Sequence, residues 1–157
     1  MEELMEMRQL LEAGRYPEAM LLLDELDEMA KDDKINKIES YLEILLLHLI
    51  KQQAEKRTTR SWNLSIRNAT RDVLRSWKRR KSGGYYLSAN ELREAVAEVF
   101  LDALGAATQE AFGGTYSEKQ LQAMITPERI QEEALRRLLK PTEDDNDLDS
   151  DYLQWLK

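Results

Sequence analysis

The apolar run between positions 41 and 50 constrains the fold of this chain more than any other stretch. Within it only Glu43 and His48 are polar. Apolar residues recur three and four positions apart through and before this run, the spacing that places side chains on one face of an α-helix: Ile35, Ile38, Leu42, Leu45 and Leu49. Because a helix that is apolar nearly all round must be enclosed by other elements, the pattern predicts a central buried helix over about residues 34–55.

This run is too short to cross a membrane. Its uncharged part, Ile44 to Ile50, covers about seven residues, whereas a bilayer requires about 20. The first residues, Met-Glu-Glu-Leu-Met-Glu, are acidic where a signal peptide would be basic. We therefore expect a soluble cytoplasmic protein with no membrane partner.

The flanking sequence also has helical periodicity. Leu4, Met7 and Leu11 form a short stripe that ends at Gly14, and Pro17 suits the first position of the next helix. The expected inner face of that next helix is Ala19, Leu22, Leu23, Leu26 and Met29. The polar sequence from Lys31 to Lys34 joins it to the central helix, and the pattern leaves open whether the chain turns there.

Beyond the central helix the same periodicity continues. A fourth helix is predicted by one narrow apolar sector: Trp62, Ile66, Ala69, Val73 and Trp77. Capping boxes at Ser88–Glu91 and Ser117–Gln120, and Thr126 followed by Pro127, mark three further helix starts. No segment alternates with the period of a strand. The prediction is an all-α fold, an irregular bundle of six to seven helices spanning residues 1–140, with an acidic tail at 141–157 that is either docked or disordered.

Charge is unevenly distributed along the chain. The net charge is −7, yet residues 51–81 hold 11 basic and 2 acidic groups, residues 1–50 hold 5 basic and 13 acidic groups, and residues 141–157 hold 1 basic and 6 acidic groups. A single short block is therefore strongly basic inside an acidic protein. The chain has no cysteine, which excludes disulfides, thiolate catalysis and cysteine-based zinc sites.

Several of these residues together resemble a known family. They are Glu25, Glu28, Glu39, the sequence Leu45-Leu46-x-His48-Leu49-x-Lys51, Arg57, Arg60-Ser61-Trp62 and Ile66. Over about residues 20–80 this pattern resembles the bacterial, mainly cyanobacterial, domain of unknown function family number 29. The resemblance implies an all-helical intracellular domain. The family has no assigned activity, so the resemblance gives no residue a catalytic role.

A candidate pocket surrounds the only histidine. His48 and Lys51 lie one helical turn apart, and the set that could converge there is Glu39, His48, Lys51, Arg57, Arg60 and Trp62. One interpretation makes His48 a hydrogen-bonded core residue and Trp62 a packing anchor. The other is a pocket for acid–base chemistry or for an anion.

Catalytic motifs are absent around this pocket. Leu45 stands three residues before His48, so the Glu-x-x-His motif of di-metal bundles is missing. Ser40 and Ser61 lack the glycines of a nucleophile elbow. We predict no catalytic residue, no metal ligand and no cofactor.

The basic helix, about residues 56–81, is the second candidate site. The side chains that could track phosphates are Arg60, Arg67, Arg71, Arg75, Lys78 and Arg79. The alternative is a solvated face partly neutralised by acidic segments, and the overall acidity opposes the approach of nucleic acid. A further hypothesis is that the acidic tail covers this helix and limits what binds there.

These observations favour a small protein-interaction module that acts through a protein partner or self-association. The first alternative is a nucleic-acid-binding accessory protein that uses the basic helix, and the second is an enzyme with a pocket near His48.

Overall fold

The computed structural model describes residues 2–79 and 83–157, which fold as an all-α structure without strands. The fold class predicted from the sequence is thus confirmed. The last part of the predicted basic block, residues 80–82, lies outside the described residues. The elements are α1 (Glu2–Glu12), α2 (Tyr16–Glu55), α3 (Arg60–Trp77), α4 (Ala89–Glu110), η1 (Ala111–Gly114), α5 (Glu118–Ala123), α6 (Pro127–Leu139), η2 (Glu143–Asn146) and η3 (Gln154–Leu156).

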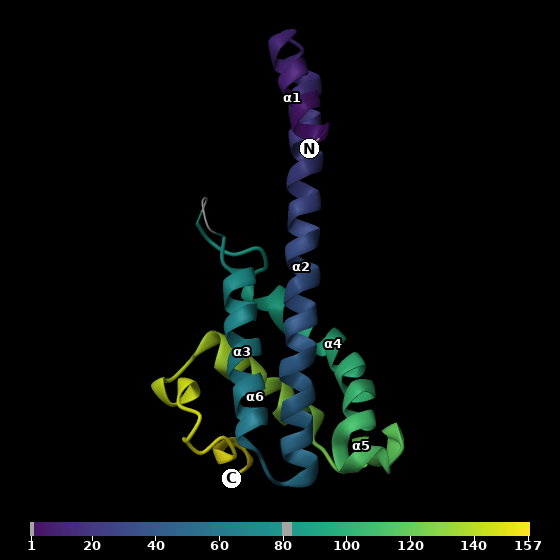
Figure 1. Cartoon of the computed structure of the whole chain (residues 1–157), viewed down its shortest axis with the longest axis vertical. Coiled ribbons are helices and arrows are strands. Elements are labelled where there is room, and N and C mark those ends of the chain that lie inside the picture. The colour runs from purple at the N-terminus through teal and green to yellow at the C-terminus, as the bar shows by residue number, and fades with distance from the viewer. Residues whose placement is uncertain (1, 80–82) are drawn as a thin grey trace.

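Helix α2 forms the long axis of the molecule (Figure 1). It has 40 residues, which at 1.5 Å per residue gives a length of about 60 Å. It joins the second and central helices of the sequence pattern into one, because the polar junction from Lys31 to Lys34 contains neither Gly nor Pro to interrupt helical hydrogen bonding. The helix ends where Lys56 adopts a left-handed conformation with φ of 55°.

The C-terminal half of α2 lies at the centre of the bundle. Helices α3, α4 and α6 pack around it. Six of its apolar side chains are completely enclosed: Ile38, Leu42, Leu45, Leu46, Leu49 and Ile50. They include four of the five members of the predicted stripe, and the fifth, Ile35, is partly buried. Trp77 of α3 is also buried and donates a 2.7 Å hydrogen bond from Nε1 to the Leu87 carbonyl. Trp62, at the other end of α3, is only partly buried.

The N-terminal half of α2 projects away from this bundle, and α1 packs against it (Figure 1). We call this helical hairpin, residues 2–33, the arm. Its turn is made at Gly14, whose φ is +74°. Ala19 is the only arm residue that is fully buried, among those the structure describes. The arm therefore has a thin interface and almost no core of its own.

The tail, residues 141–157, follows α6 through two short helical turns and lies against α3 and α6. The Tyr152 ring is 2% exposed, and its hydroxyl donates a 2.7 Å hydrogen bond to the Asp145 carbonyl. The Trp155 indole Nε1 donates to Gln52 Oε1 at 3.1 Å, which connects the tail to α2. These contacts place the tail over one side of the bundle.

Among the helices in the described part of the chain, none has both the length and the apolar character that crossing a membrane requires.

Candidate interaction surfaces

Three of the six residues of the predicted pocket meet at the end of α2. The Lys51 Nζ lies 4.5 Å from the centroid of the Trp62 ring, and the Arg57 Cζ lies 4.6 Å from it. The Lys51 side chain is 8% exposed and forms a 3.3 Å ion pair with Glu110 Oε1. The two cations therefore hold the indole by cation–π contact.

His48 lies beside this cluster, and its imidazole is hydrogen-bonded to the backbone of its own helix. The Nδ1 is 2.8 Å from the Ile44 carbonyl oxygen, so that nitrogen carries the proton and donates. Burial lowers the pKa of His48, and the nearby charge of Lys51 acts in the same direction, while the hydrogen bond to Ile44 and the charge of Glu110 oppose it. The ring is thus held neutral to a lower pH than usual.

Glu39 and Arg60 lie elsewhere. Glu39 stands nine positions before His48, about 13 Å along the helix, and lines a shallow hollow with Asn36 and Asp102. The exposed Arg60 guanidinium is 3.8 Å from the Asp149 carboxylate in the tail. The structure therefore brings Lys51, Arg57 and Trp62 together next to His48, and it does not add Glu39 or Arg60 to them.

The predicted basic face of α3 is divided between two environments. Its N-terminal part contacts the tail: Arg67 Nη1 donates to the Asn146 carbonyl, and Arg71 Nη2 donates to the Asn146 side chain, both at 3.3 Å. The Arg67 Nε is buried without a hydrogen-bond partner among the described residues. Covering this part of α3 therefore has a desolvation cost.

The C-terminal part of the same face is open. Arg75, Lys78 and Arg79 line a surface hollow together with Leu74. The Arg79 guanidinium lies 4.0 Å from Asp27 of the arm and 5.1 Å from the centre of the Tyr86 ring. Half of the candidate polyanion surface is thus available to solvent.

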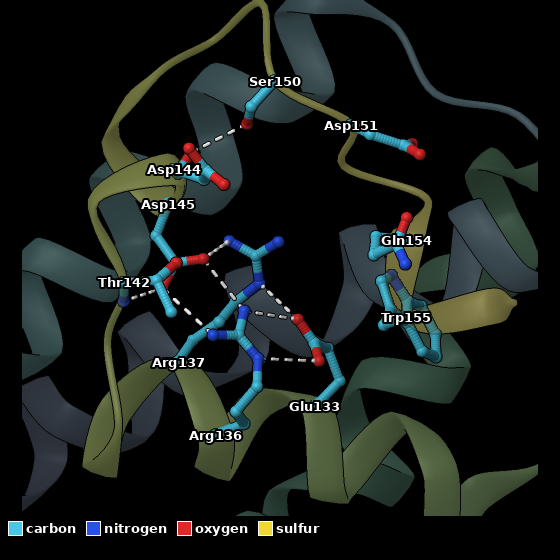
Figure 2. A pocket seen from close by; sticks show the side chains of 10 residues that line it. All are labelled: Glu133, Arg136, Arg137, Thr142, Asp144, Asp145, Ser150, Asp151, Gln154 and Trp155. Atoms are coloured by element: carbon cyan, nitrogen blue, oxygen red, sulfur yellow. Dashed lines mark hydrogen bonds and ion pairs between the residues drawn. The ribbon is translucent and has the colours of Figure 1, made fainter.

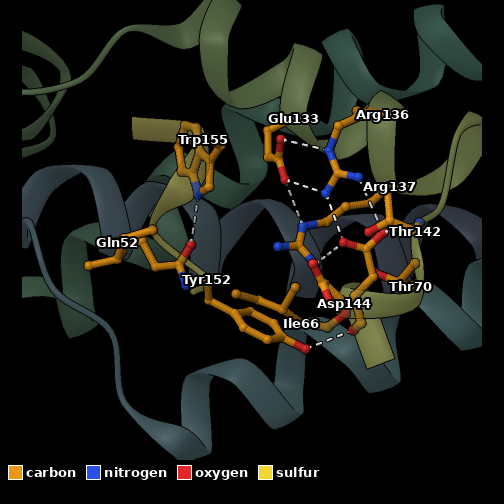
Figure 3. A network of polar contacts seen from close by, with 12 residues as sticks. Gln52, Ile66, Thr70, Glu133, Arg136, Arg137, Thr142, Asp144, Tyr152 and Trp155 are labelled. Carbon is orange, nitrogen blue, oxygen red and sulfur yellow. Dashed lines mark hydrogen bonds and ion pairs between the residues drawn. The ribbon is translucent and has the colours of Figure 1, made fainter. Parts of the chain in front are cut away.

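A network of charged groups joins α6 to the tail (Figure 3). Arg137 Nε donates to Glu133 Oε1 at 2.9 Å, and both side chains are at most 7% exposed. Arg136 forms hydrogen bonds with both Glu133 and Asp145. Burial raises the pKa of Asp145, but hydrogen bonds from Arg136 and the Thr142 backbone, with the charges of both arginines, outweigh it and leave the pKa lowered.

The arm presents a surface of a different character. Eight of its large apolar side chains are exposed: Leu4, Met5, Leu11, Tyr16, Met20, Leu21, Leu23 and Met29. Eleven acidic and three basic residues lie among them in residues 2–33. The expected inner positions Leu23 and Met29 point outward, because α1 is the only helix beside them and it covers a single stripe of α2.

Comparison with known proteins identifies the family. A family model described as domain of unknown function DUF29 matches residues 4–140. The chain belongs to this DUF29 family. No curated protein and no solved structure matches it. The matched region of the DUF29 chain includes both the arm and the bundle, and the tail follows it.

Sequence reasoning about this DUF29 domain missed two features. The Glu133–Arg137 pair has a local signal, since an acid followed three and four positions later by arginines places opposite charges on one helix face. Its burial has no such signal, because it depends on Asp145 and Tyr152 of the tail. The exposure of apolar side chains on the arm also has no sequence signal, because apolar residues three and four positions apart are equally typical of a buried helix.

Proposed function

We propose that this DUF29 protein is a protein-interaction module whose arm binds a cationic amphipathic helix of a partner protein. The observation that carries the proposal is the concentration of apolar surface on the arm. Of the fourteen large hydrophobic side chains that are exposed, eight belong to residues 2–33, about a fifth of the chain. Clustered apolar side chains on a surface are typical of interaction sites.

The arm is short of packing partners. Only one stripe of each helix faces the other, and even there Met7, Leu10, Leu22 and Leu26 remain partly exposed. In helical domains most of the stability of a helix comes from packing an apolar face. A third helix laid along one side of the hairpin would bury the half-covered stripe and the exposed residues that flank it on that side, as in helix-in-groove recognition.

Charge indicates the chemistry of that third helix. Eleven acidic groups against three basic ones surround the apolar side chains of residues 2–33. A second acidic arm would be repelled, whereas a helix with Lys or Arg beside its apolar face would be attracted and steered into place. The partner proposed is therefore a basic amphipathic helix and not another copy of the arm.

The test uses the full chain and a designed amphipathic peptide of leucine and lysine, with a scrambled peptide of equal charge as its control. We expect the amphipathic peptide to bind at least tenfold more tightly than the scrambled one. The double variant Met20→Glu, Leu23→Glu should lose that preference. Leu101→Glu is the control, because Leu101 on α4 is at least as exposed as Met20 and Leu23 and lies outside the arm. Equal binding of the two peptides, or equal losses in the arm and control variants, would refute the proposal.

One observation favours a second candidate function, the binding of nucleic acid or another polyanion. Arg75, Lys78 and Arg79 lie together on an open hollow of α3, while the tail contacts Arg60, Arg67 and Arg71. A polyanion would bind the open half first, and it would bind more tightly if the tail moved aside.

Binding of duplex DNA by the full chain at several salt concentrations tests this candidate. We expect Arg75→Ala with Lys78→Ala to weaken binding and to flatten the salt dependence. Arg93→Ala, an exposed position on α4, should leave it unchanged. Deleting residues 142–157 should strengthen it, provided that circular dichroism shows the shortened chain folded. Salt-independent binding, or equal effects at Arg93 and the α3 pair, would exclude the second candidate.

A further inference from the structure

A pocket of about 430 Å³ lies between α6 and the tail, on the bundle and outside the arm (Figure 2). Glu133, Arg136 and Arg137 form its α6 side. The opposite side comes from the tail: Thr142, Asp144, Asp145, Ser150, Asp151, Gln154 and Trp155. Its volume falls within the range of about 300–1,000 Å³ that is usual for small-molecule sites.

Arg137 is the most constrained group in this pocket. The residue is 4% exposed, its Nε donates to Glu133, and its Nη1 lies 3.5 Å from Asp145 Oδ1. The guanidinium carbon lies 4.9 Å from the centre of the Tyr152 ring, which supports the group from one face. Two carboxylates and an aromatic ring therefore fix the orientation of the guanidinium.

One nitrogen of this guanidinium is left over. The Nη2 of Arg137 makes no hydrogen bond to any residue in the described part of the chain. Both close views show it directed away from Glu133 and Asp145, toward the side where Trp155 lies (Figures 2 and 3). Arg137 as a whole is buried, but its Nη2 is not among the fully buried atoms that lack a partner, so this nitrogen is accessible from the pocket. An accessible ionised donor favours a ligand with a negatively charged acceptor, because charge-assisted hydrogen bonds are the strongest.

The remaining charges make a simple anion an unfavourable ligand. Glu133 and Asp145 already balance Arg136 and Arg137, and Asp151 accepts a 2.6 Å hydrogen bond from Lys157. The carboxylate of Asp144 has no hydrogen-bond or ion-pair partner among the described residues. Asp144 is exposed and lines the pocket, so its carboxylate is available to a ligand. A ligand that offers a carboxylate to Arg137 would gain a second contact if it also carried a positive group that faces Asp144.

Trp155 supplies the apolar wall. Its indole Nε1 donates to Gln52 and its carbonyl accepts from Arg129, so the residue is fixed at both ends. A held indole presents a flat face to an apolar or aromatic group in the pocket.

We propose that this pocket binds a free α-amino acid with an apolar or aromatic side chain. Its carboxylate bonds to Nη2 of Arg137, its ammonium group faces Asp144, and its side chain packs against Trp155. The site is built jointly from α6, which lies inside the matched family region, and the tail, which follows that region.

Calorimetric titration of the full chain with L-leucine, L-phenylalanine and L-tryptophan tests the proposal. We expect saturable binding of at least one of them. The N-acetyl derivative, which lacks the positive charge, and the carboxamide, which lacks the negative charge, should each bind at least tenfold more weakly. If none of the three amino acids binds, or if either blocked derivative binds as tightly as its parent, the proposal fails.

Variants then locate the site. Asp144→Asn should weaken binding at least tenfold while leaving the Glu133–Arg137 pair intact. Glu143→Gln serves as its control, because Glu143 is exposed like Asp144 but does not line the pocket. Arg137→Lys keeps the positive charge but removes the planar guanidinium and its Nη2 donor, so it should abolish binding. Equal affinities for the Asp144→Asn and Glu143→Gln variants would overturn the assignment, whatever the stability of the Arg137 variant.

Discussion

The two halves of α2 have the same backbone conformation and opposite surroundings. From Ile38 to Ala54 nearly every apolar side chain is enclosed by three other helices. From Tyr16 to Asp33 the same helix packs against α1, is approached by Arg79 at Asp27, and buries only Ala19. Apolar residues recur at helical spacing in both halves. The two halves differ in the number of helices that cover the apolar face. The periodicity of the sequence does not predict that number.

A helix can therefore extend well beyond the core that stabilises it. Helix growth adds one hydrogen bond per residue once a helix exists, so the buried half supplies the start that the exposed half needs. The part of α2 in the arm keeps its helical shape through this continuity and through its contact with α1. Its apolar residues remain free to serve another purpose.

Amide hydrogen exchange should give the largest contrast between the halves. Amides near Leu45 and Leu49 should open only with global unfolding, which for a domain of this kind requires about 5–15 kcal/mol. Arm amides should open with a much smaller free energy, because few buried contacts hold them. Exchange measured by NMR or mass spectrometry checks this, and equal protection along all of α2 would contradict it.

The second largest contrast should come from truncating a buried side chain and an exposed one and comparing the change in the free energy of unfolding. Leu45 is fully buried, so Leu45→Ala should lower the free energy of unfolding by about 2–5 kcal/mol. Leu21→Ala, the same change at an arm residue that is 67% exposed, should alter it by less than about 0.5 kcal/mol. Denaturant unfolding of both variants measures the difference. A comparable loss at Leu21 would mean that the arm is covered in solution.

Replacement of glycine should act on the two regions with opposite sign. Gly14 turns the arm at a positive φ with open space around it, so Gly14→Ala should cost about 1–2 kcal/mol from backbone strain alone. Gly105 lies within α4, also with open space where a Cβ would stand, and Gly105→Ala should stabilise by about 0.5–1 kcal/mol. Exchange rates of α1 and thermal unfolding report the two effects. The same sign at both sites would show that backbone conformation is not the cause.

The smallest effect should be a pH dependence confined to the buried half. The pKa of His48 is lowered by burial, so the unfolded chain binds the proton more readily than the folded one. Stability should fall as the pH drops below the unfolded value of about 6.5 toward the lower folded value. His48→Gln should remove this slope, as His48 is the only histidine. An unchanged slope between pH 5 and 7 would assign it to other groups.

Much of the fold could be predicted because its causes are local. The stripe that contains Ile38, Leu42 and Leu45 identifies the buried helix. Both capping boxes, at Ser88 and Ser117, form as the sequence predicts. At Thr126 the helix begins as expected with Pro127 at its first position, although the threonine side chain makes no capping hydrogen bond.

The remaining features depend on residues that are distant in sequence. Trp62 meets Lys51 only because the chain reverses between α2 and α3, and Glu39 is separated from His48 by the geometry of a straight helix. The partners of Arg67 and Arg71 are in the tail, about 75–79 positions later. Local periodicity carries no information about such contacts. The sequence therefore allowed candidate sites to be proposed, but it could not show which of the proposed residues meet in the folded protein.

The length of α2 also sets a working distance. A partner held on the outer arm would sit on a stiff spacer tens of ångströms from the pocket beside α6, too far for either occupant to touch the other. Any coupling of binding at the arm to binding at this pocket would have to be transmitted through α2. The 18 residues of α2 that belong to the arm, from Tyr16 to Asp33, span about 27 Å, which is close to the diameter of a small domain.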